Sequence, residues 1–355
     1  MTEIHHMIAG AAVGDAITNY AFEIRNIFRE SGIHSEVYAP YQHIAPSLRK
    51  EVHPVLKNMP IINKKNITLF YQFSIGSVMT EYFMHSPGRK VLCYQNITPE
   101  HYFRGMNDQT ARKLFEGREE LKKLVNVPDI TLATSKFNAT ELEELGYKNI
   151  HNIPLALNTN YLLTKPSQNI INSYNDNYTN FLFVGRVTPN KKLENVLKVF
   201  YYYNKTINPS SRLIFAGGYD HSEKYLKMLL DLAKEMELKN VVFTSHVSLE
   251  DLLGFYSAST LFLCMSEHEG VCIPLIESMY FQKPVFALAK AAVPGTMGGT
   301  GILLQKKNYR EIAELIDVVL KDSNMLKNII EKQNNRINNF KKENLKKQLQ
   351  QILGF

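Results

Sequence analysis

The sequence has few features that would mark it for secretion, for a membrane or for a structural metal. It contains only three cysteines, Cys93, Cys264 and Cys272, an odd number whose spacing matches no zinc pattern. No apolar run approaches the roughly 18–20 residues that a membrane span needs, and the first residues lack the charged end and long apolar core of a secretion signal. We therefore expect reduced thiols in a cytoplasmic protein.

Several motifs of catalysis are absent as well. The chain has no G-x-G-x-x-G and no Walker pattern, which argues against a nicotinamide dehydrogenase and against a P-loop. It has no H-E-x-x-H, no clustered Cys and His and no D-x-D, so we expect no protein-bound catalytic metal. Without a G-x-S-x-G, an α/β-hydrolase nucleophile is not supported either.

The charge is basic overall and unevenly distributed. The chain carries 41 Lys or Arg and 34 Asp or Glu, and residues 306–355 hold eleven basic against six acidic residues. One interpretation is a solvated, lysine-rich helical tail, and the other is weak attraction to an anionic membrane face or acceptor. A nucleic-acid partner is not indicated, because the segment lacks interleaved aromatic residues and the chain lacks nucleic-acid motifs.

Short apolar strands alternate with helical patterns along the whole chain, which is typical of parallel sheets covered on both faces. At 355 residues the chain exceeds what one hydrophobic core usually supports, so we expect two domains. The expected class is α/β, with two doubly wound Rossmann-like domains facing across a cleft. Strands are predicted at 3–9, 34–39, 67–73, 90–95, 129–135, 180–185, 212–218, 240–245, 260–265, 284–288 and 301–304; helices at 15–31, at 135–146, from Ser248, and over the last 45 or so residues.

The stretch 158–180 interrupts this alternation, because it is rich in Asn, Ser, Thr and Tyr. We interpret it as a long connection between the domains. The predicted organisation is an N-terminal domain over 1–157, a second domain over 158–337 and a C-terminal helix over 338–355. Ligands of such sheets bind beyond the carboxyl ends of the strands, so the loops at those ends are the candidate sites.

An acidic turn follows the strand at 260–265. The helix after it is expected to begin near Ile273, with Pro274 in its first turn, where a missing N–H is harmless. A helix start and a glycine-containing turn suit a phosphate, and the carboxylates of Glu269 and Glu277 suit vicinal sugar hydroxyls. The alternative is a solvated Glu269 and a Glu277 that merely stabilises the helix dipole.

A basic loop follows the strand at 180–185. Arg186 and Lys191 stand between that strand and the next helix, in the same domain as the acidic turn. Arg grips two oxygens at once and Lys acts as a point charge, so the pair suits a diphosphate. A solvated basic loop is the alternative, and Lys192 is expected to be solvated.

Weaker candidates lie at three other strand ends. Gly14 and Asp15 follow the first strand and either contact a ligand or, for Asp15, cap the next helix. Gln95 and Asn96 follow the strand at 90–95, and His246 follows the strand at 240–245. Each places a polar group where a parallel sheet presents its ligands.

Together these segments resemble glycosyltransferase family 4, a family of retaining enzymes with the GT-B fold, in a branch tied to polysaccharide or O-antigen assembly. The resemblance covers most of the chain and is carried by SEHEGVCIPLIESM (266–279), FVGRVTPNKKLENVL (183–197), GDAI (14–17), YQNITP (94–99) and SKFNATELEELGY (135–147). It implies a role for each candidate. Glu269 would bind hydroxyls of the donor sugar, Glu277 would bind the ribose, and Arg186 and Lys191 would bind the diphosphate. Backbone groups of Gly270, Val271 and Cys272 would contact the sugar and phosphate, and His246 and Val247 would contact the base. Gly14 and Asp15 would close over the donor, and Gln95 and Asn96 would lie on the acceptor side.

The implied function is metal-independent, retaining transfer of a hexose from a UDP- or GDP-linked sugar to a glycan or lipid-linked hydroxyl, without a cofactor. The resemblance also implies that a last helix near 340–352 crosses back to the first domain, and it allows peripheral contact with the inner membrane face. Two departures stand out: relatives of this branch usually have His in place of Gln95, and many have an aromatic residue in place of Val271. A glycoside phosphorylase and a non-catalytic subunit of a glycan-assembly complex remain as alternatives. The sequence leaves open the base, sugar, acceptor, linkage and oligomeric state.

Overall fold

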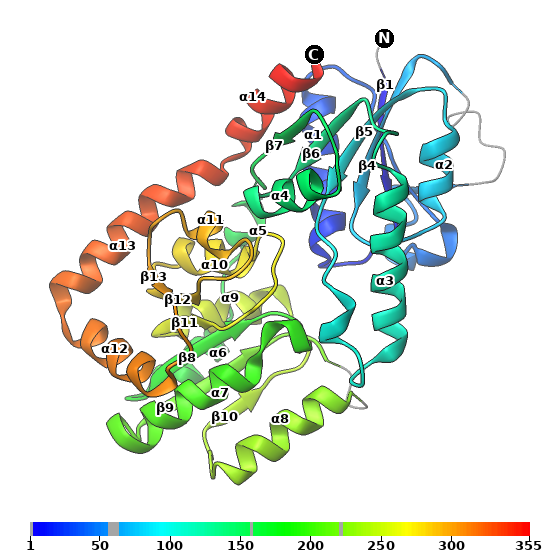
Figure 1. Ribbon diagram of the computed structural model, residues 1–355. Coiled ribbons are helices and arrows are strands. Elements are labelled where there is room, and N and C mark those ends of the chain that lie inside the picture. The colour runs from blue at the N-terminus through cyan, green and yellow to red at the C-terminus, as the bar shows by residue number, and fades with distance from the viewer. Residues whose placement is uncertain (1–2, 56–63, 157–158, 220–222) are drawn as a thin grey trace. The chain divides into compact units, whose positions relative to one another are not determined.

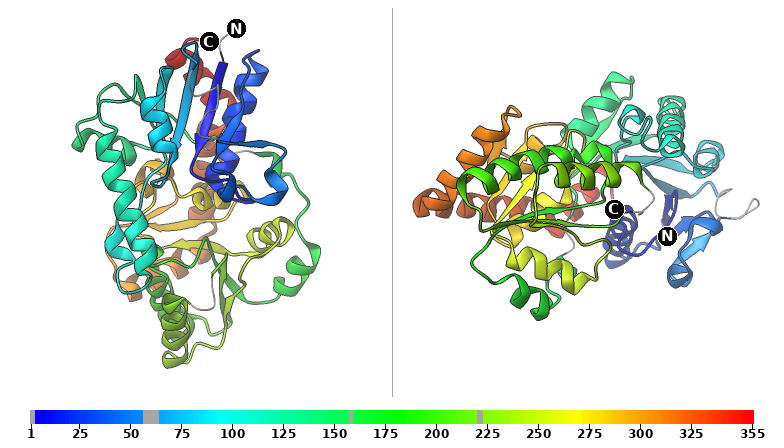
Figure 2. Two further views of the ribbon diagram at one scale, coloured as in Figure 1. Left: turned by 90° about the vertical axis from the view of Figure 1, so that its right-hand side faces the viewer. Right: turned by 90° about the horizontal axis from the view of Figure 1, so that it is seen from below.

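The chain forms two compact units, each built on one parallel sheet (Figure 1). The computed structural model describes residues 3–55, 64–156, 159–219 and 223–355. Unit 1 comprises Met1–His101, Asp108–Ala156 and Phe340–Phe355, and unit 2 comprises Tyr102–Asn107 and Leu157–Asn339. Helices cover both faces of each sheet (Figure 2), which confirms the expected α/β class with two Rossmann-like units. The packing of Tyr102–Asn107 with unit 2 was not expected.

Unit 1 has a seven-stranded sheet in the order β3-β2-β1-β4-β5-β6-β7, and every recorded strand pair is parallel. The order reverses between β1 and β4, the crossover point where open α/β sheets bind ligands. Its elements are β1 (Glu3–Ile8), α1 (Ala16–Glu30), β2 (Val37–Ala39), β3 (Val52–Pro54), β4 (Ile67–Phe73), α2 (Met79–His85), β5 (Arg89–Tyr94), α3 (Asp108–Lys123), β6 (Ile130–Ala133), α4 (Lys136–Glu144), β7 (Ile150–Asn152) and α14 (Lys342–Leu353).

The last helix, α14, belongs to unit 1 although the preceding residues of the chain belong to unit 2. Its apolar stripe of Leu345, Leu349 and Leu353 is buried, as the four-residue spacing requires of one helix face. Beside α1, the Lys342 ammonium lies 2.6 Å from the Glu30 carboxylate. Burial of this stripe therefore fixes the end of the chain to the first sheet's helices.

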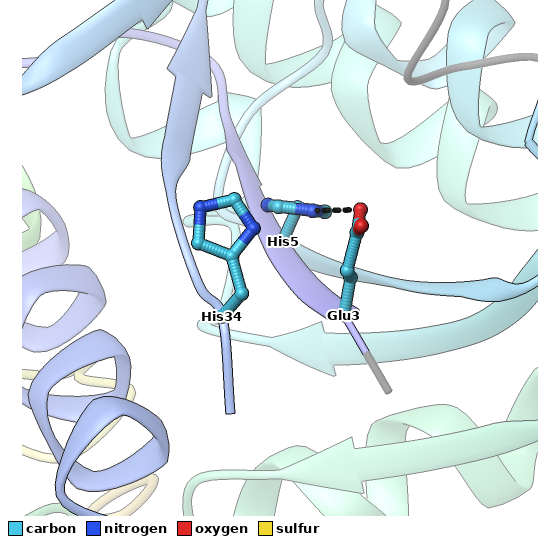
Figure 3. A group of neighbouring side chains, drawn as sticks. All are labelled: Glu3, His5 and His34. Atoms are coloured by element: carbon cyan, nitrogen blue, oxygen red, sulfur yellow. Dashed lines mark hydrogen bonds and ion pairs between the residues drawn. The ribbon is translucent and has the colours of Figure 1, made fainter. Parts of the chain in front are cut away.

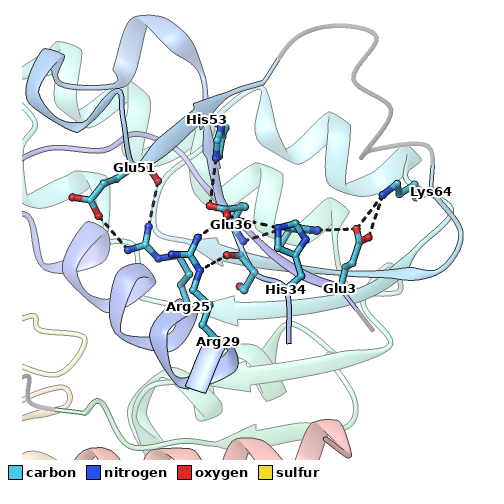
Figure 4. Close-up of polar contacts among 10 residues, drawn as sticks. Glu3, Arg25, Arg29, His34, Glu36, Glu51, His53 and Lys64 are labelled. Atoms are coloured by element: carbon cyan, nitrogen blue, oxygen red, sulfur yellow. Dashed lines mark hydrogen bonds and ion pairs between the residues drawn. The ribbon is translucent and has the colours of Figure 1, made fainter. Parts of the chain in front are cut away.

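The amino edge of the first sheet is held by ion pairs (Figure 4). Glu36 is contacted by Arg29 at 2.6 Å and by His53 at 3.3 Å. Glu3 accepts from Lys64 at 3.1 Å. These residues lie where the strands begin, at the edge opposite the one that presents ligands in such sheets, so we assign them to stability rather than to a site.

Unit 2 repeats the same topology with six parallel strands in the order β10-β9-β8-β11-β12-β13. Its core is one apolar cluster in which the strands contribute Phe, Leu, Ile and Val side chains that are almost completely buried. Its elements are α5 (Thr159–Leu162), α6 (Gln168–Tyr174), β8 (Thr179–Val184), α7 (Leu193–Tyr202), β9 (Ser211–Ala216), α8 (Lys224–Glu235), β10 (Val241–Phe243), α9 (Leu249–Ala258), β11 (Leu261–Cys264), α10 (Ile273–Tyr280), β12 (Val285–Leu288), α11 (Val293–Met297), β13 (Ile302–Leu304), α12 (Tyr309–Lys321) and α13 (Ser323–Ile337).

The segment 158–180, interpreted from the sequence as a long connection between the domains, contains helices that were not predicted. Residues 157–158 lie outside the described part of the chain, and the rest contains the helices α5 and α6. Helix α6 packs closely on α9, because Gly254 leaves space for Ile170: a Cβ at residue 254 would lie 2.9 Å from the Ile170 Cβ. The segment therefore folds as part of unit 2, with α6 packed on α9.

The short strands β3 and β7 were not predicted.

Within the described residues, no helix is both long and apolar enough to span a bilayer.

Two glycines bring the carboxyl ends of β8 and β9 into backbone contact. Gly185 (φ 146°) donates its N–H to the Ala216 carbonyl at 3.0 Å, and Gly217 (φ 152°) follows directly. A Cβ at residue 217 would lie 2.2 Å from the Gly185 carbonyl oxygen. Only glycine fits there, and the contact sets where the loop after β8 leaves the sheet.

We predict that Gly217→Ala lowers the free energy of unfolding by about 2–4 kcal/mol, because the methyl group meets the Gly185 backbone and the φ angle disfavours a side chain. The melting temperature should fall by roughly 5–15 °C. The matched control is Gly218→Ala, since a Cβ at residue 218 meets nothing within 4 Å. Equal melting temperatures for the two variants would contradict the assigned contact.

Candidate active site

The basic loop leads from β8 into α7 at the carboxyl edge of the second sheet. After Gly185 the chain forms a single 3-10 turn, Pro189–Lys191, and then passes through Lys192 in the left-handed region (φ 53°). This turn directs Lys191 back toward the sheet, while the side chain of Arg186 is exposed. The strand end therefore presents one inward and one outward cation.

The acidic turn leads from β11 into α10 at the same edge. The helix begins at Ile273 with Pro274 in its first turn, as predicted. The left-handed residue of the turn is Cys272 (φ 68°) rather than a glycine, and no side chain caps the helix. Because uncapped first-turn N–H groups and the helix dipole favour an anion, this helix start is suited to a phosphate.

An ion pair joins the two loops. The Lys191 ammonium donates to Glu269 Oε1 at 2.5 Å, and the exposed fractions of these side chains are only 18% and 9%. Burial alone lowers the pKa of Lys191, but the Glu269 carboxylate together with the neighbouring Cys272 and Cys264 more than offsets burial, so the pKa is raised. The Lys191 ammonium is therefore charged near neutral pH. Removing one partner of such a buried pair costs about 3–5 kcal/mol.

Hydrogen bonds from neighbouring residues fix the positions of the two loops that carry this ion pair. The buried side chain of Asn190 donates to the His268 carbonyl at 3.0 Å, and the Asn190 carbonyl accepts from the Glu267 N–H at 3.0 Å. On the far side of the turn, Thr296 donates its hydroxyl hydrogen to the Val271 carbonyl at 2.5 Å. The turn is thus anchored on both sides of Glu269.

Glu277 is buried and bound by two tyrosines. Tyr256 donates to Glu277 Oε2 at 2.6 Å, and Tyr161 of α5 donates to Oε1. Burial raises the pKa of Glu277, and the two phenol hydroxyls offset only part of that effect. This carboxylate is therefore held in one orientation, by residues that the sequence analysis did not select.

The remaining predicted residues of unit 2 lie in two places, after β10 and in the acidic turn itself. His246 is exposed after β10, and Val247 packs on the apolar core of the unit. Gly270 is half-buried in the acidic turn. Lys192, which was expected to be solvated, has a side chain that is 27% exposed, and its ammonium lies 3.7 Å from Glu194 and 3.9 Å from Glu267.

The predicted residues of unit 1 form two separate groups at strand ends. Asp15 is the N-cap of α1, because its Oδ2 accepts from both the N–H and the hydroxyl of Thr18 at 2.9 Å. Gly14 precedes it, exposed and with φ 75°. Of the two alternatives for Asp15, the capping role is observed.

The second group of unit 1 follows β5. Asn96 takes a left-handed backbone (φ 83°) and donates to Asn138 at 2.9 Å and to Glu141 at 2.8 Å. Gln95 donates to Cys93 Sγ at 3.4 Å. Arg118 also pairs with Glu141, at 3.2 Å. A half-buried polar network thus holds the strained Asn96 at the carboxyl end of β5. Strain of this kind is concentrated at functional sites.

A pocket of about 400 Å³ opens within unit 2 beside the acidic turn. Ligand pockets measure roughly 300–1,000 Å³, so this volume suits a small molecule. On its wall Lys307 pairs with Glu267, and Lys192 lies 5.5 Å from the centre of the Tyr102 ring. The lining residues are Tyr102, Glu267, Leu288, Lys290, Gln305 and Lys307.

Two groups of side chains have the composition of a metal site in the described part of the chain. Glu3, His5 and His34 lie at the amino edge of the first sheet (Figure 3), and Cys264, Glu269 and Cys272 lie in the acidic turn. Within each group the candidate ligand atoms lie within 4.8 Å of one another.

Sequence comparison links the chain to known proteins, and the family match lies in unit 2. Residues 165–336 match the model of the family described as glycosyl transferases group 1. The O-antigen chain mannosyltransferase B of Escherichia coli is 21% identical over 68% of this chain and 64% of its own length, and the capsular polysaccharide biosynthesis glycosyltransferase CapM of Staphylococcus aureus is 26% identical over 46% and 42%. The chain thus spans less than two thirds of the length of these curated relatives.

Structural comparison covers both units. HepE of Anabaena, solved in complex with UDP-glucose, superposes with a TM-score of 0.76 at 16% identity over 99% of each chain. Sucrose-phosphate synthase of Thermosynechococcus elongatus gives 0.73 at 17% identity, over 99% of this chain and 98% of that one. The fold is therefore that of GT-B proteins.

The raised pKa of Glu277 generates a prediction about pH. A carboxyl group whose pKa is raised on folding adds stability below its ordinary value, 4.5, and that contribution is lost as pH rises through the folded-state pKa. The melting temperature of the natural protein, relative to Glu277→Gln, should therefore fall as pH increases from 4.5. Thermal unfolding of both proteins across this range is the test, and a difference that stays constant or grows would contradict the assignment.

Proposed function

We propose that the chain is a glycosyltransferase that moves a hexose-type sugar from a nucleotide diphosphate sugar to a hydroxyl of a glycan or lipid-linked acceptor in polysaccharide assembly. The family match over residues 165–336 supports sugar transfer, and the names of the curated relatives support polysaccharide assembly. The UDP-glucose complex of HepE, a protein with the same fold, supports a nucleotide sugar as donor.

The buried Lys191–Glu269 pair beside the start of α10 is the observation that carries the proposal. It puts a cation, a carboxylate and uncapped helix N–H groups together at the carboxyl edge of a parallel sheet. A sugar diphosphate needs these three groups: positive charge and N–H donors for the phosphates, and a carboxylate for the sugar hydroxyls.

During transfer, negative charge develops on the leaving diphosphate and positive charge on the anomeric carbon. Lys191 and the first-turn N–H groups of α10 stabilise the leaving phosphate, and the exposed Arg186 supplies a further cation. Glu269 accepts hydrogen bonds from sugar hydroxyls and keeps Lys191 oriented. Because these groups already provide positive charge for the diphosphate, the proposed reaction needs no bound metal.

Glu277 is proposed to bind the ribose, which then takes the place of a tyrosine hydroxyl as hydrogen-bond donor to this carboxylate. His246 and Val247 are assigned to the base, and the backbone of Gly270, Val271 and Cys272 to the sugar and phosphate. In unit 1, Gly14 is proposed to contact the donor, and Gln95 and Asn96 to contact the acceptor. Glutamine binds a hydroxyl but takes up no proton near neutral pH, so Gln95 is a binding group only.

The proposal predicts that Lys191→Ala lowers turnover by about 10²–10³-fold, the typical effect of losing one donor to a developing anion. Sugar transfer is measured on protein whose folding has been checked by thermal unfolding, because the substitution leaves Glu269 unpaired. Lys192→Ala is the matched control, since this neighbouring ammonium pairs with Glu194 and Glu267 instead. Folded, fully active Lys191→Ala would remove Lys191 from the site.

The donor class is tested by thermal shift with UDP, GDP, dTDP and their sugars. A ligand at 100 times its dissociation constant stabilises the protein by about 2.7 kcal/mol, which corresponds to a rise of roughly 5–10 °C. We expect one nucleotide family to give this shift. Binding without transfer would favour a non-catalytic subunit, and release of a sugar phosphate from a glycan in free phosphate would favour a phosphorylase.

The stereochemistry and the metal requirement are tested on the product. With the proposed retaining reaction, proton NMR of the first product should show the anomeric configuration of the donor, and EDTA should leave the rate unchanged. A product of inverted configuration would overturn the retaining mechanism, and loss of activity in EDTA that Mg²⁺ or Mn²⁺ restores would overturn metal independence.

A further inference from the structure

The turn that carries Glu269 also carries two buried thiols. Cys264 ends β11 and Cys272 precedes α10, and their sulfur atoms lie 4.0 Å apart. Their exposed fractions are 1% and 7%. The Glu269 carboxylate completes a group in which one ligand atom from each residue lies within 4.8 Å of the others.

This arrangement is close to the geometry of a zinc site. Two thiolates that bind Zn²⁺ at about 2.3 Å each, in a tetrahedron, have sulfur atoms about 3.8 Å apart. The observed separation of 4.0 Å needs almost no change, and the carboxylate oxygen needs to approach the sulfur atoms by at most about 1.2 Å to reach a bonding distance. Two sulfurs and one carboxylate leave the fourth position for water.

Charge balance also favours a divalent cation. Zinc binding deprotonates both thiols and releases two protons to solvent, after which two thiolates, the Glu269 carboxylate, the Lys191 ammonium and a divalent ion sum to zero. Lys191 therefore offsets the excess negative charge that this buried ligand set would otherwise carry.

The cluster of Glu3, His5 and His34 fails the corresponding comparison (Figure 3). His5 Nδ1 accepts the Glu36 N–H at 3.2 Å, so the neutral ring carries its proton on Nε2, which donates to Glu3 at 3.2 Å. A metal ion bound to His5 Nε2 would require removal of the Nε2 proton. Because Nδ1 still accepts the Glu36 N–H and carries no proton, the ring would then have to be an imidazolate anion.

We infer that Cys264, Cys272 and Glu269 bind a thiophilic divalent cation of the Zn²⁺ type, and that the bound ion inhibits the enzyme. The ion takes the carboxylate that is proposed to hold the donor sugar, so the inhibitory half of the inference rests on the proposed function. The proposed ion is not a catalytic metal, because the enzyme cannot bind the donor sugar through Glu269 while the ion is bound there.

The binding half is tested with Co²⁺ as a spectroscopic probe on the whole 355-residue chain in its reduced form. One equivalent of Co²⁺ should produce thiolate-to-cobalt charge-transfer absorption in the near ultraviolet, and Zn²⁺ should abolish it by displacement. The Cys264→Ala variant should bind at least about 100-fold more weakly, since even the loss of an outer partner costs 10–100-fold. Cys93→Ala is the control, a buried cysteine on β5 in unit 1.

The inhibitory half is tested by sugar transfer in Zn²⁺. The natural protein and Cys93→Ala should be inhibited, with recovery in EDTA, whereas Cys264→Ala should retain transfer in zinc. Absence of the cobalt band, or an equal band in Cys264→Ala, would overturn the metal site and leave the proposed function untouched. A normal cobalt band without inhibition would overturn the assignment of Glu269 to the donor sugar.

If Cys264→Ala does not fold, Cys264→Ser serves as the second variant. Its oxygen ligand gives no thiolate charge transfer, so the cobalt absorption should fall by about half. An unchanged band intensity would then count against the site.

Discussion

The candidate site depends on one buried ion pair between residues 78 positions apart in the chain, Lys191 and Glu269. Neither charge is stable alone at this depth, because an unpaired buried charge is strongly destabilising. The pair therefore joins the loop after β8 to the loop after β11, two neighbouring strands at the centre of the second sheet. The same two groups have the charges that a sugar diphosphate requires, so stability and binding share one set of atoms.

The fold explains how these loops reach each other. In the strand order β10-β9-β8-β11-β12-β13 the order reverses between β8 and β11, so the loops that follow these two neighbouring strands start side by side, at the crossover point where open α/β sheets bind ligands. The backbone contact between Gly185 and Gly217 fixes the exit of the first loop, and the Asn190 and Thr296 hydrogen bonds fix the second. Rigid elements thus position both charges before any ligand arrives, which is the arrangement that electrostatic stabilisation needs.

Much of the fold was predictable, because apolar periodicity is local. The strand predicted at 67–73 matches β4, and the helices predicted at 15–31 and 135–146 match α1 and α4 within one or two residues at each end. The strands β3 and β7 have three residues each, with His, Pro or Asn among them, too few to show alternation. Helix α6 was missed because its stability comes from packing on Gly254 of α9, a contact that composition does not reveal.

The site was predictable only in part, because sequence patterns do not reveal tertiary contacts. Motif spacing selected Lys191, Glu269 and Glu277, yet nothing local indicates that Lys191 pairs with Glu269 or that Tyr161 and Tyr256 hold Glu277. The positive φ of Cys272, and its contact with Cys264, likewise arise from the tertiary fold. Sequence reasoning identifies the chemical groups, and the structure identifies their partners.

The central claim is that the Lys191–Glu269 pair stands where a sugar diphosphate binds. The most direct measurement is a crystal structure of the chain with a non-reactive nucleotide diphosphate sugar. The account predicts a phosphate oxygen within hydrogen-bond distance of Lys191 Nζ and a sugar hydroxyl on Glu269. A diphosphate bound elsewhere, with the ion pair unchanged and remote from the sugar, would contradict it.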